Sequence, residues 1–129
     1  MKKNIVILCL ILITIFTSCK QEINTPNGSL TNTSWSRQDD GYASMTEELE
    51  FKDSYLSAKL VWGGPYSSGT NFVTMVNGNK LYLNTWGKAT PSTSSYDSVY
   101  SFTMDKTNLL LTYSGGAVIQ DLAGKYTKK

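Results

Sequence analysis

The sequence predicts an all-β domain, a small antiparallel up-and-down barrel of about eight strands, on three observations. Short stretches of alternating apolar and polar residues recur from Ser34 onward. Short runs rich in Gly, Asn, Asp and Ser separate them, whereas helical periodicity is hard to find. Several of these connections are tight enough to join antiparallel neighbours, and closing the sheet removes its two exposed edges. A flattened β-sandwich is the alternative architecture.

The first four expected strands lead from a tryptophan into alternating segments. They span 34–37, 45–51, 55–62 and 71–76. Alternate residues of a strand point to the same side. In the second strand Met45, Leu49 and Phe51 therefore share one face, and Glu47 falls among them. In the third strand the apolar face carries Leu56, Ala58, Leu60 and Trp62.

The last four expected strands follow the strongest turn signal in the chain. Asn77-Gly78 supplies the two positive-φ residues of a type I′ hairpin turn. The strands after it span 80–86, 98–104, 109–113 and 117–126, the last with a break near Gly124. Combining the faces predicts a core that contains Leu49, Phe51, Leu60, Leu81, Leu83, Phe102, Leu109 and Leu111.

Trp35, which follows Leu30-Thr31-Asn32-Thr33-Ser34, resembles the opening of small lipocalin-like domains found in lipoproteins of Bacteroidota. The later segments Leu81-Tyr82-Leu83 and Leu109-Leu110-Leu111 also fit this family. The chain lacks the glycine that usually precedes the tryptophan. The resemblance covers the whole domain and implies a lipocalin-like barrel that could bind a small ligand, with no assigned chemistry.

The N-terminus has the features of an export signal. Lys2 and Lys3 precede an apolar run that ends at Thr17-Ser18-Cys19. This run is shorter than the ~20 residues of a membrane span. Its end resembles a bacterial lipobox, except that Phe16 replaces the usual Leu, and this resemblance implies that Cys19 is lipidated. The alternatives are a plain cleaved signal or an uncleaved anchor.

The expected organisation has three parts. Residues 1–18 are a lipoprotein signal peptide, 19–33 a flexible tether that begins with the lipidated cysteine, and 34–129 the barrel domain. The tether prediction rests on a polar stretch with Pro26 and Gly28 and no hydrophobic period. Alternatively, part of this stretch around Leu30 packs on the domain. Lipidation implies a location in the bacterial cell envelope, either periplasmic or surface-exposed.

Composition limits the function classes. Without Lys2 and Lys3 the chain has 10 basic and 10 acidic residues, so no basic patch predicts nucleic-acid binding. It has no histidine, and Arg37 is its single arginine. The common general base, the commonest metal ligand and the usual phosphate clamp are thus missing or scarce. We expect no enzyme activity, catalytic residue, cofactor or metal, and we expect a monomer.

The acidic residues offer few candidates for a site. Glu48 and Glu50 share one strand face, which predicts a solvated outer surface. Asp39-Asp40-Gly41 lacks the further acidic residues of a calcium loop and predicts a turn. Glu47 is unusual because it falls on the apolar face. It lies near the strand end, or it pairs with Arg37 or a lysine, and a buried carboxylate would be a candidate functional group.

Aromatic residues give the main binding signal. They fall at strand ends or in the longer connections, at Tyr42, Trp62, Tyr66, Trp86 and Tyr96. Alternate connections of a meander lie at the same end of a barrel, so we expect these side chains around one mouth. Ordinary rim packing is the alternative.

Two functions remain open. The first is a membrane-anchored binding module that holds a small apolar or amphipathic ligand, or a glycan, at the mouth. The second is a filled barrel that interacts with, or inhibits, another envelope protein.

Overall fold

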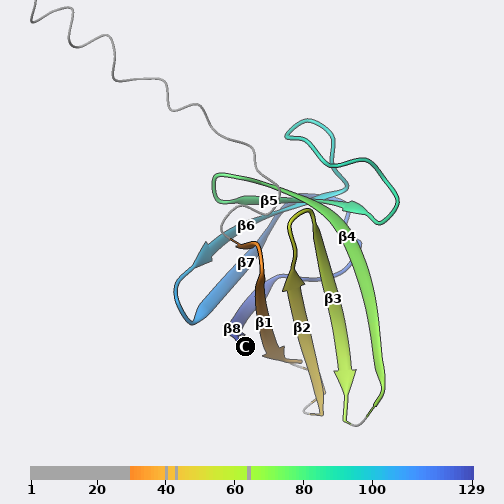
Figure 1. Cartoon of the computed structure of the whole chain (residues 1–129), viewed down its shortest axis with the longest axis vertical. Coiled ribbons are helices and arrows are strands. Elements are labelled where there is room, and N and C mark those ends of the chain that lie inside the picture. The colour runs from red at the N-terminus through yellow and green to blue at the C-terminus, as the bar shows by residue number, and fades with distance from the viewer. Residues whose placement is uncertain (1–29, 40, 43, 64) are drawn as a thin grey trace, which may run out of the picture.

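The computed structural model describes residues 30–39, 41–42, 44–63 and 65–129. These residues form an antiparallel barrel whose strands pair in sequence order and close through β1 and β8 (Figure 1). The strands are β1 (Thr33–Gln38), β2 (Met45–Phe51), β3 (Tyr55–Trp62), β4 (Ser67–Asn77), β5 (Lys80–Thr85), β6 (Ser98–Met104), β7 (Asn108–Gly116) and β8 (Gly124–Lys128). The predicted all-β up-and-down barrel is confirmed, and the sandwich alternative is excluded.

Side-chain alternation fills the interior of the barrel. Leu49 of β2 lies opposite Trp35 of β1 and Ala58 of β3, and all three are buried. Seven of the eight predicted core residues are buried, and Leu60 is half-buried near the end of β3. The largest side chains with under 2% exposure include Trp35, Phe51, Phe72, Tyr100 and Tyr126, which belong to one continuous cluster. The lumen is therefore packed with side chains.

The barrel begins before the expected boundary. Leu30 is fully buried in the core, and its carbonyl accepts a hydrogen bond from the Thr33 hydroxyl at 2.5 Å. The amide of Asn32 donates to the Phe51 carbonyl at 2.9 Å. Residues 30–33, which we expected in the tether, thus pack on the domain, as the alternative prediction holds. The predicted signal peptide and Cys19 lie outside the described residues.

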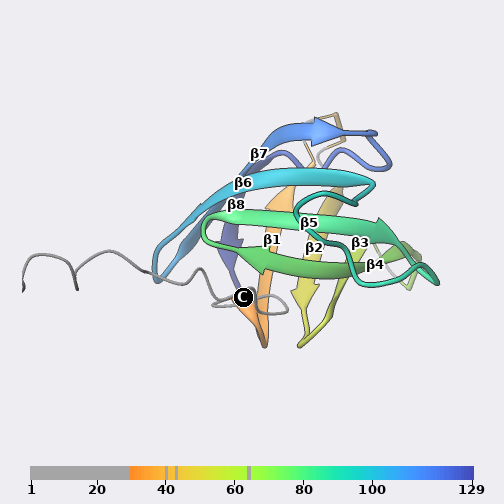
Figure 2. The ribbon, with the colours of Figure 1, turned by 90° about the horizontal axis from the view of Figure 1, so that it is seen from above.

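β4 is long and changes partner along its length. Its first part, Ser67–Val73, pairs with β3, whereas Phe72–Asn77 pairs with β5. β4 curves through this change, and the strands from β5 to β7 run across the direction of β1 to β3 (Figures 1 and 2). This stagger, which a closed barrel requires, places the end of β5 beside the middle of β4.

The last predicted strand, 117–126, is wrong over most of its length, because β8 begins only at Gly124. The segment 117–123 leaves the sheet between Gly116, with φ 91°, and Gly124, with φ 146°. Residues with a Cβ rarely adopt such backbone angles. Between these glycines Leu122 is fully buried in the main core. Burial of the Leu122 side chain therefore stabilises a backbone path in which residues 117–123 turn inward instead of pairing with the sheet.

Neighbouring leucines on β7 test the strand register. Leu111 is 1% exposed and Leu110 is 45% exposed. Leu111→Ala should lower the free energy of unfolding by about 3 kcal/mol because it opens a cavity. Leu110→Ala, the matched control, should lower it by about 0.5 kcal/mol or less. Urea denaturation measures both, and equal losses would show that the register is wrong.

Candidate functional site

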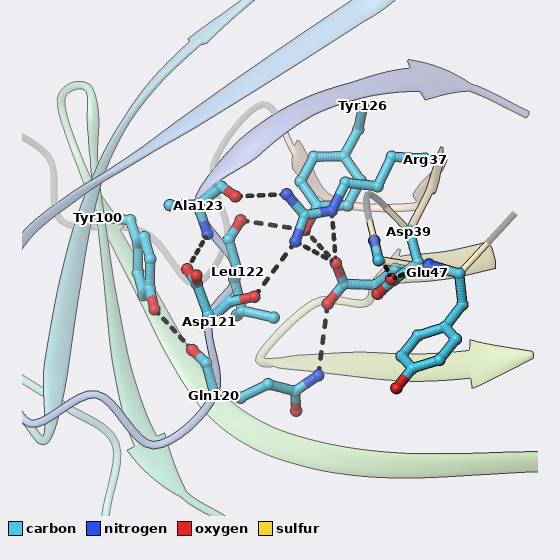
Figure 3. A network of polar contacts seen from close by, with 11 residues as sticks. Arg37, Asp39, Glu47, Tyr100, Gln120, Asp121, Leu122, Ala123 and Tyr126 are labelled. Atoms are coloured by element: carbon cyan, nitrogen blue, oxygen red, sulfur yellow. Dashed lines mark hydrogen bonds and ion pairs between the residues drawn. The ribbon is translucent and has the colours of Figure 1, made fainter. Parts of the chain in front are cut away.

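Glu47 is a buried carboxylate on the inner face of β2. The residue is 3% exposed, between the predicted apolar neighbours of the same face. Its Oε2 atom accepts a hydrogen bond from Arg37 Nε at 2.6 Å, forms an ion pair with Arg37 Nη2 at 2.6 Å, and lies 2.9 Å from the Tyr126 hydroxyl (Figure 3). The predicted alternative that Glu47 pairs with Arg37 is therefore confirmed. A buried carboxylate needs such partners because an uncompensated charge is costly in a protein interior.

Arg37 connects β1 to the segment that precedes β8. Its Nη1 donates to the Ala123 carbonyl, and its Nη2 donates to the Asp121 carbonyl at 3.3 Å. Its guanidinium also lies over the Tyr126 ring, 4.8 Å from the centroid. A Cβ at position 124 would overlap Nη1, so the glycine there provides the space that Arg37 occupies.

The hydroxyl groups of two tyrosines bind backbone carbonyls of the segment 117–123. The Tyr100 hydroxyl donates to the Gln120 carbonyl at 2.8 Å. The Tyr126 hydroxyl lies 3.0 Å from the Leu122 carbonyl, so its one proton serves either this carbonyl or Glu47 at a time. Burial, reinforced by the charge of Glu47, raises the pKa of Tyr126 above its usual value. The hydroxyl therefore stays protonated and remains a donor at ordinary pH.

Two adjoining clefts open above this network, at the end of the barrel that we call the mouth. The mouth carries the β1–β2 connection (39–44), the β3–β4 connection (63–66) and the segment 117–123. The larger cleft, of about 390 Å³, is lined by Arg37, Asp39, Gly41, Glu47, Leu60, Gln120, Asp121 and Ala123. The smaller, of about 190 Å³, is lined by Ala58, Leu60, Ser68, Gly69, Thr70 and Gln120. Leu60 and Gln120 line both, so we treat them as one mouth cleft.

Three of the five predicted aromatic residues lie near the mouth. Tyr42 and Tyr66 are in its two β-connections and are 66% and 71% exposed. Trp62 ends β3, on the same face as Leu60, and is 36% exposed. These positions are compatible with the predicted mouth, and a role in ligand binding stays a prediction.

Trp86 and Tyr96 lie elsewhere. The connection from β5 to β6 projects from the side of the barrel, away from the β1–β2 and β3–β4 connections (Figure 1). Trp86 packs edge-on against Tyr55 at 5.7 Å between centroids, and Tyr96 packs against Tyr82 at 5.3 Å. The structure therefore does not gather all five aromatics at one mouth. The reason is the stagger of β4, which alternation of connections alone does not reveal.

Asp97 organises this side connection. Its carboxylate accepts a hydrogen bond from Lys88 at 2.7 Å and another from the Thr85 amide at 2.8 Å. These two donors lower the pKa of Asp97 to about 2. Tyr96 of this connection packs on Tyr82, which forms a small buried apolar cluster with Met75 and Val99. The connection therefore serves packing of the outer wall.

The other acidic residues lie in turns and surface ion pairs. Asp39 accepts hydrogen bonds from the amides of Gly41 and Tyr42, at 2.8 and 3.1 Å, as the predicted turn requires. Glu48 pairs with Lys129, and Glu50 pairs with Lys52. Within the described part of the chain, no three His, Cys, Asp or Glu side chains come together as a metal site would need.

The sequence did not reveal the contributions of Gln120, Asp121 and Tyr126. These residues lie in or near the segment that the sequence predicts to be a strand. Gln120 and Tyr126 reach Glu47 from 73 and 79 positions away in the chain, and the Asp121 carbonyl accepts a hydrogen bond from Arg37. The sequence did contain one indication of the inward turn, which is the apolar Leu122 directly before Ala123-Gly124.

Comparison with known proteins yields no relative. Neither a protein-family description, nor a curated protein, nor a solved structure matches this chain. The fold and the site therefore define an antiparallel β-barrel domain with a polar mouth cleft. Among the residues that the structure describes, we find no helix with the length and apolar character of a membrane span.

Removing the Tyr126 hydroxyl tests the buried network. Tyr126→Phe deletes a donor to the buried Glu47 carboxylate and should lower the free energy of unfolding by about 1.5–3 kcal/mol. Tyr42→Phe, at a site 66% exposed, is the matched control and should change it by less than about 0.5 kcal/mol. Thermal or urea unfolding measures both variants. Equal stability of Tyr126→Phe and the native chain would contradict the network.

Proposed function

We propose that this protein is a membrane-anchored binding module of the cell envelope that holds a small amphipathic ligand or a glycan at the mouth. The observation that carries the proposal is the mouth cleft above a packed lumen. A packed lumen leaves no interior space for a ligand, so binding at the mouth is shallow. Ligand sites combine apolar lining with a few placed polar groups. Leu60 provides apolar lining, and Gln120 and Thr70 provide polar groups.

The anchoring part of the proposal rests on the sequence. The apolar run that ends at Cys19 resembles a lipobox, and lipidation there would hold the barrel at a membrane. β1 starts at the end of the barrel opposite the β1–β2 and β3–β4 connections (Figure 1). A chain tethered before β1 would thus present the mouth away from the membrane. This orientation suits a module that meets its ligand in the surrounding space.

A second candidate is the filled barrel that acts as an interaction or inhibitor subunit. It is favoured by exposed apolar side chains in the segment 117–123, where Val118 is 63% exposed and Ile119 is 39% exposed. Adjacent exposed apolar residues of this kind are typical of protein contacts. In this reading the lumen is only a scaffold, and the exposed segment carries the function.

Native mass spectrometry of the chain isolated from its host separates the two candidates. The native protein should carry a bound small molecule. Leu60→Trp, which fills the cleft, should lose it, whereas Leu110→Trp on the outer wall should retain it. Retention of the molecule by Leu60→Trp would contradict binding in the cleft. Co-purification of a protein that is lost in the double variant Val118→Asp/Ile119→Asp would support the second candidate instead.

A further inference from the structure

The two carboxylate oxygens of Glu47 are unequally satisfied. Oε2 has Arg37 Nε and Nη2 at 2.6 Å and the Tyr126 hydroxyl at 2.9 Å. Oε1 has the Gln120 side-chain amide at 3.4 Å, which is longer than the usual ~2.7–3.2 Å of such bonds. A carboxylate oxygen accepts about two hydrogen bonds. Oε1 therefore retains accepting capacity, and Glu47 lines the mouth cleft.

Gln120 combines a fixed backbone with a weakly held side chain. Its carbonyl is bound by the Tyr100 hydroxyl at 2.8 Å, and its side chain extends toward Glu47 (Figure 3). A primary amide offers both donors and an acceptor. Beside Oε1 it forms a donor–acceptor pair. Such a pair complements neighbouring hydroxyl groups, each of which can both donate and accept.

The part of the cleft lined by β3 and β4 matches the other features of a sugar ring. The half-buried Leu60 of β3 provides apolar surface, and the exposed Ser68 and Thr70 of β4 line the cleft beside it. Sugar rings present C–H groups on their faces and hydroxyl groups at their edges. This part of the cleft therefore offers a contact for both features of the ring.

Charge restricts the ligand further. Glu47, Asp39 and Asp121 all line the cleft, and the guanidinium of Arg37 is already paired with Glu47. An anionic ligand would meet uncompensated negative charge here. A neutral ligand would not, and its hydroxyl groups could donate to Oε1.

From this combination we propose that the mouth cleft binds a neutral saccharide unit. Glu47 Oε1 accepts a hydrogen bond from one hydroxyl group, and the Gln120 amide bonds with the next. The inference rests on the proposed binding function and specifies its ligand class. Gln120 turns from its long contact with Glu47 toward the sugar, whereas Arg37 and Tyr126 hold the carboxylate in place.

Matched sugars test the ligand class by NMR titration. Every strand and core residue of the described part of the chain lies within 30–129, so ¹⁵N-labelled chain from residue 20 onward retains all of them. It is titrated with methyl hexosides of the gluco, galacto and manno series, with the corresponding uronic acids, and with octanol as an apolar probe. At least one neutral hexoside should shift the amide signals of Leu60, Gln120 and Ala123, and its uronic acid should bind at least about tenfold more weakly.

Gln120→Ala tests the recognition residue. It should weaken hexoside binding about fivefold, as expected for one hydrogen bond of about 1 kcal/mol, without lowering the melting temperature. Asn79→Ala, which removes an amide from the exposed β4–β5 turn, is the matched control and should leave binding unchanged. Equal binding by Gln120→Ala, or tighter binding of the uronic acid, would overturn the inference.

The outcomes also separate this inference from the proposed function. If octanol shifts the cleft signals and no hexoside does, the saccharide inference fails while binding at the mouth stands. If no probe shifts them, and the native chain isolated from its host carries no small molecule, both fail.

Discussion

The buried charge of Glu47 is the constraint on which the mouth depends. β2 places this carboxylate on the inner face of the barrel, and the residue is 3% exposed. Its compensation requires Arg37 from β1 and the Tyr126 hydroxyl from β8, so this carboxylate on β2 links the two strands that close the barrel. Arg37 also binds the carbonyls of the segment 117–123. The same interaction thus compensates a charge and fixes the segment that forms one wall of the cleft.

Packing and charge together determine what kind of site the barrel offers. Aromatic side chains and Leu122 fill the lumen, so the interior acts as a rigid support and the functional surface is confined to the mouth. Arg37 and Glu47 lie on β1 and β2, and positions on regular elements are more precise than positions on loops. Gln120 differs because only its backbone is held firmly. The cleft therefore combines the fixed carboxylate of Glu47 with the Gln120 side-chain amide, which can change its orientation.

Local sequence patterns predicted the barrel, but not the stagger of its strands or the path of the segment before β8. Alternation identified the inward Leu49 and Phe51, because it depends on neighbouring residues. Asn77-Gly78 identified the β4–β5 hairpin but not its turn residues. Asn77 still pairs with Lys80, so the turn is Gly78-Asn79. Among residues 77–79 only Gly78 has a positive φ, so the predicted type I′ geometry is wrong. Alternation also marked Glu47 as unusual and suggested Arg37 as a partner. The stagger of β4 and the inward path of 117–123 depend on barrel closure and on burial of Leu122, which are properties of the whole fold. For this reason alternation of the connections predicts Trp86 at the mouth, whereas its ring packs against Tyr55 and its connection projects from the side of the barrel (Figure 1).

A double-mutant cycle on the ion pair tests the account most directly. Arg37→Met leaves the Glu47 charge buried without its cation and should lower the free energy of unfolding by about 3 kcal/mol, near the lower limit for buried pairs because the Arg37 side chain is 20% exposed. Arg37→Met/Glu47→Gln removes the charge as well and should be more stable than Arg37→Met alone. Glu47→Gln alone completes the cycle. If the double variant is less stable than Arg37→Met, and its loss equals the sum of the losses of the two single variants, Glu47 does not depend on Arg37 and the account is wrong.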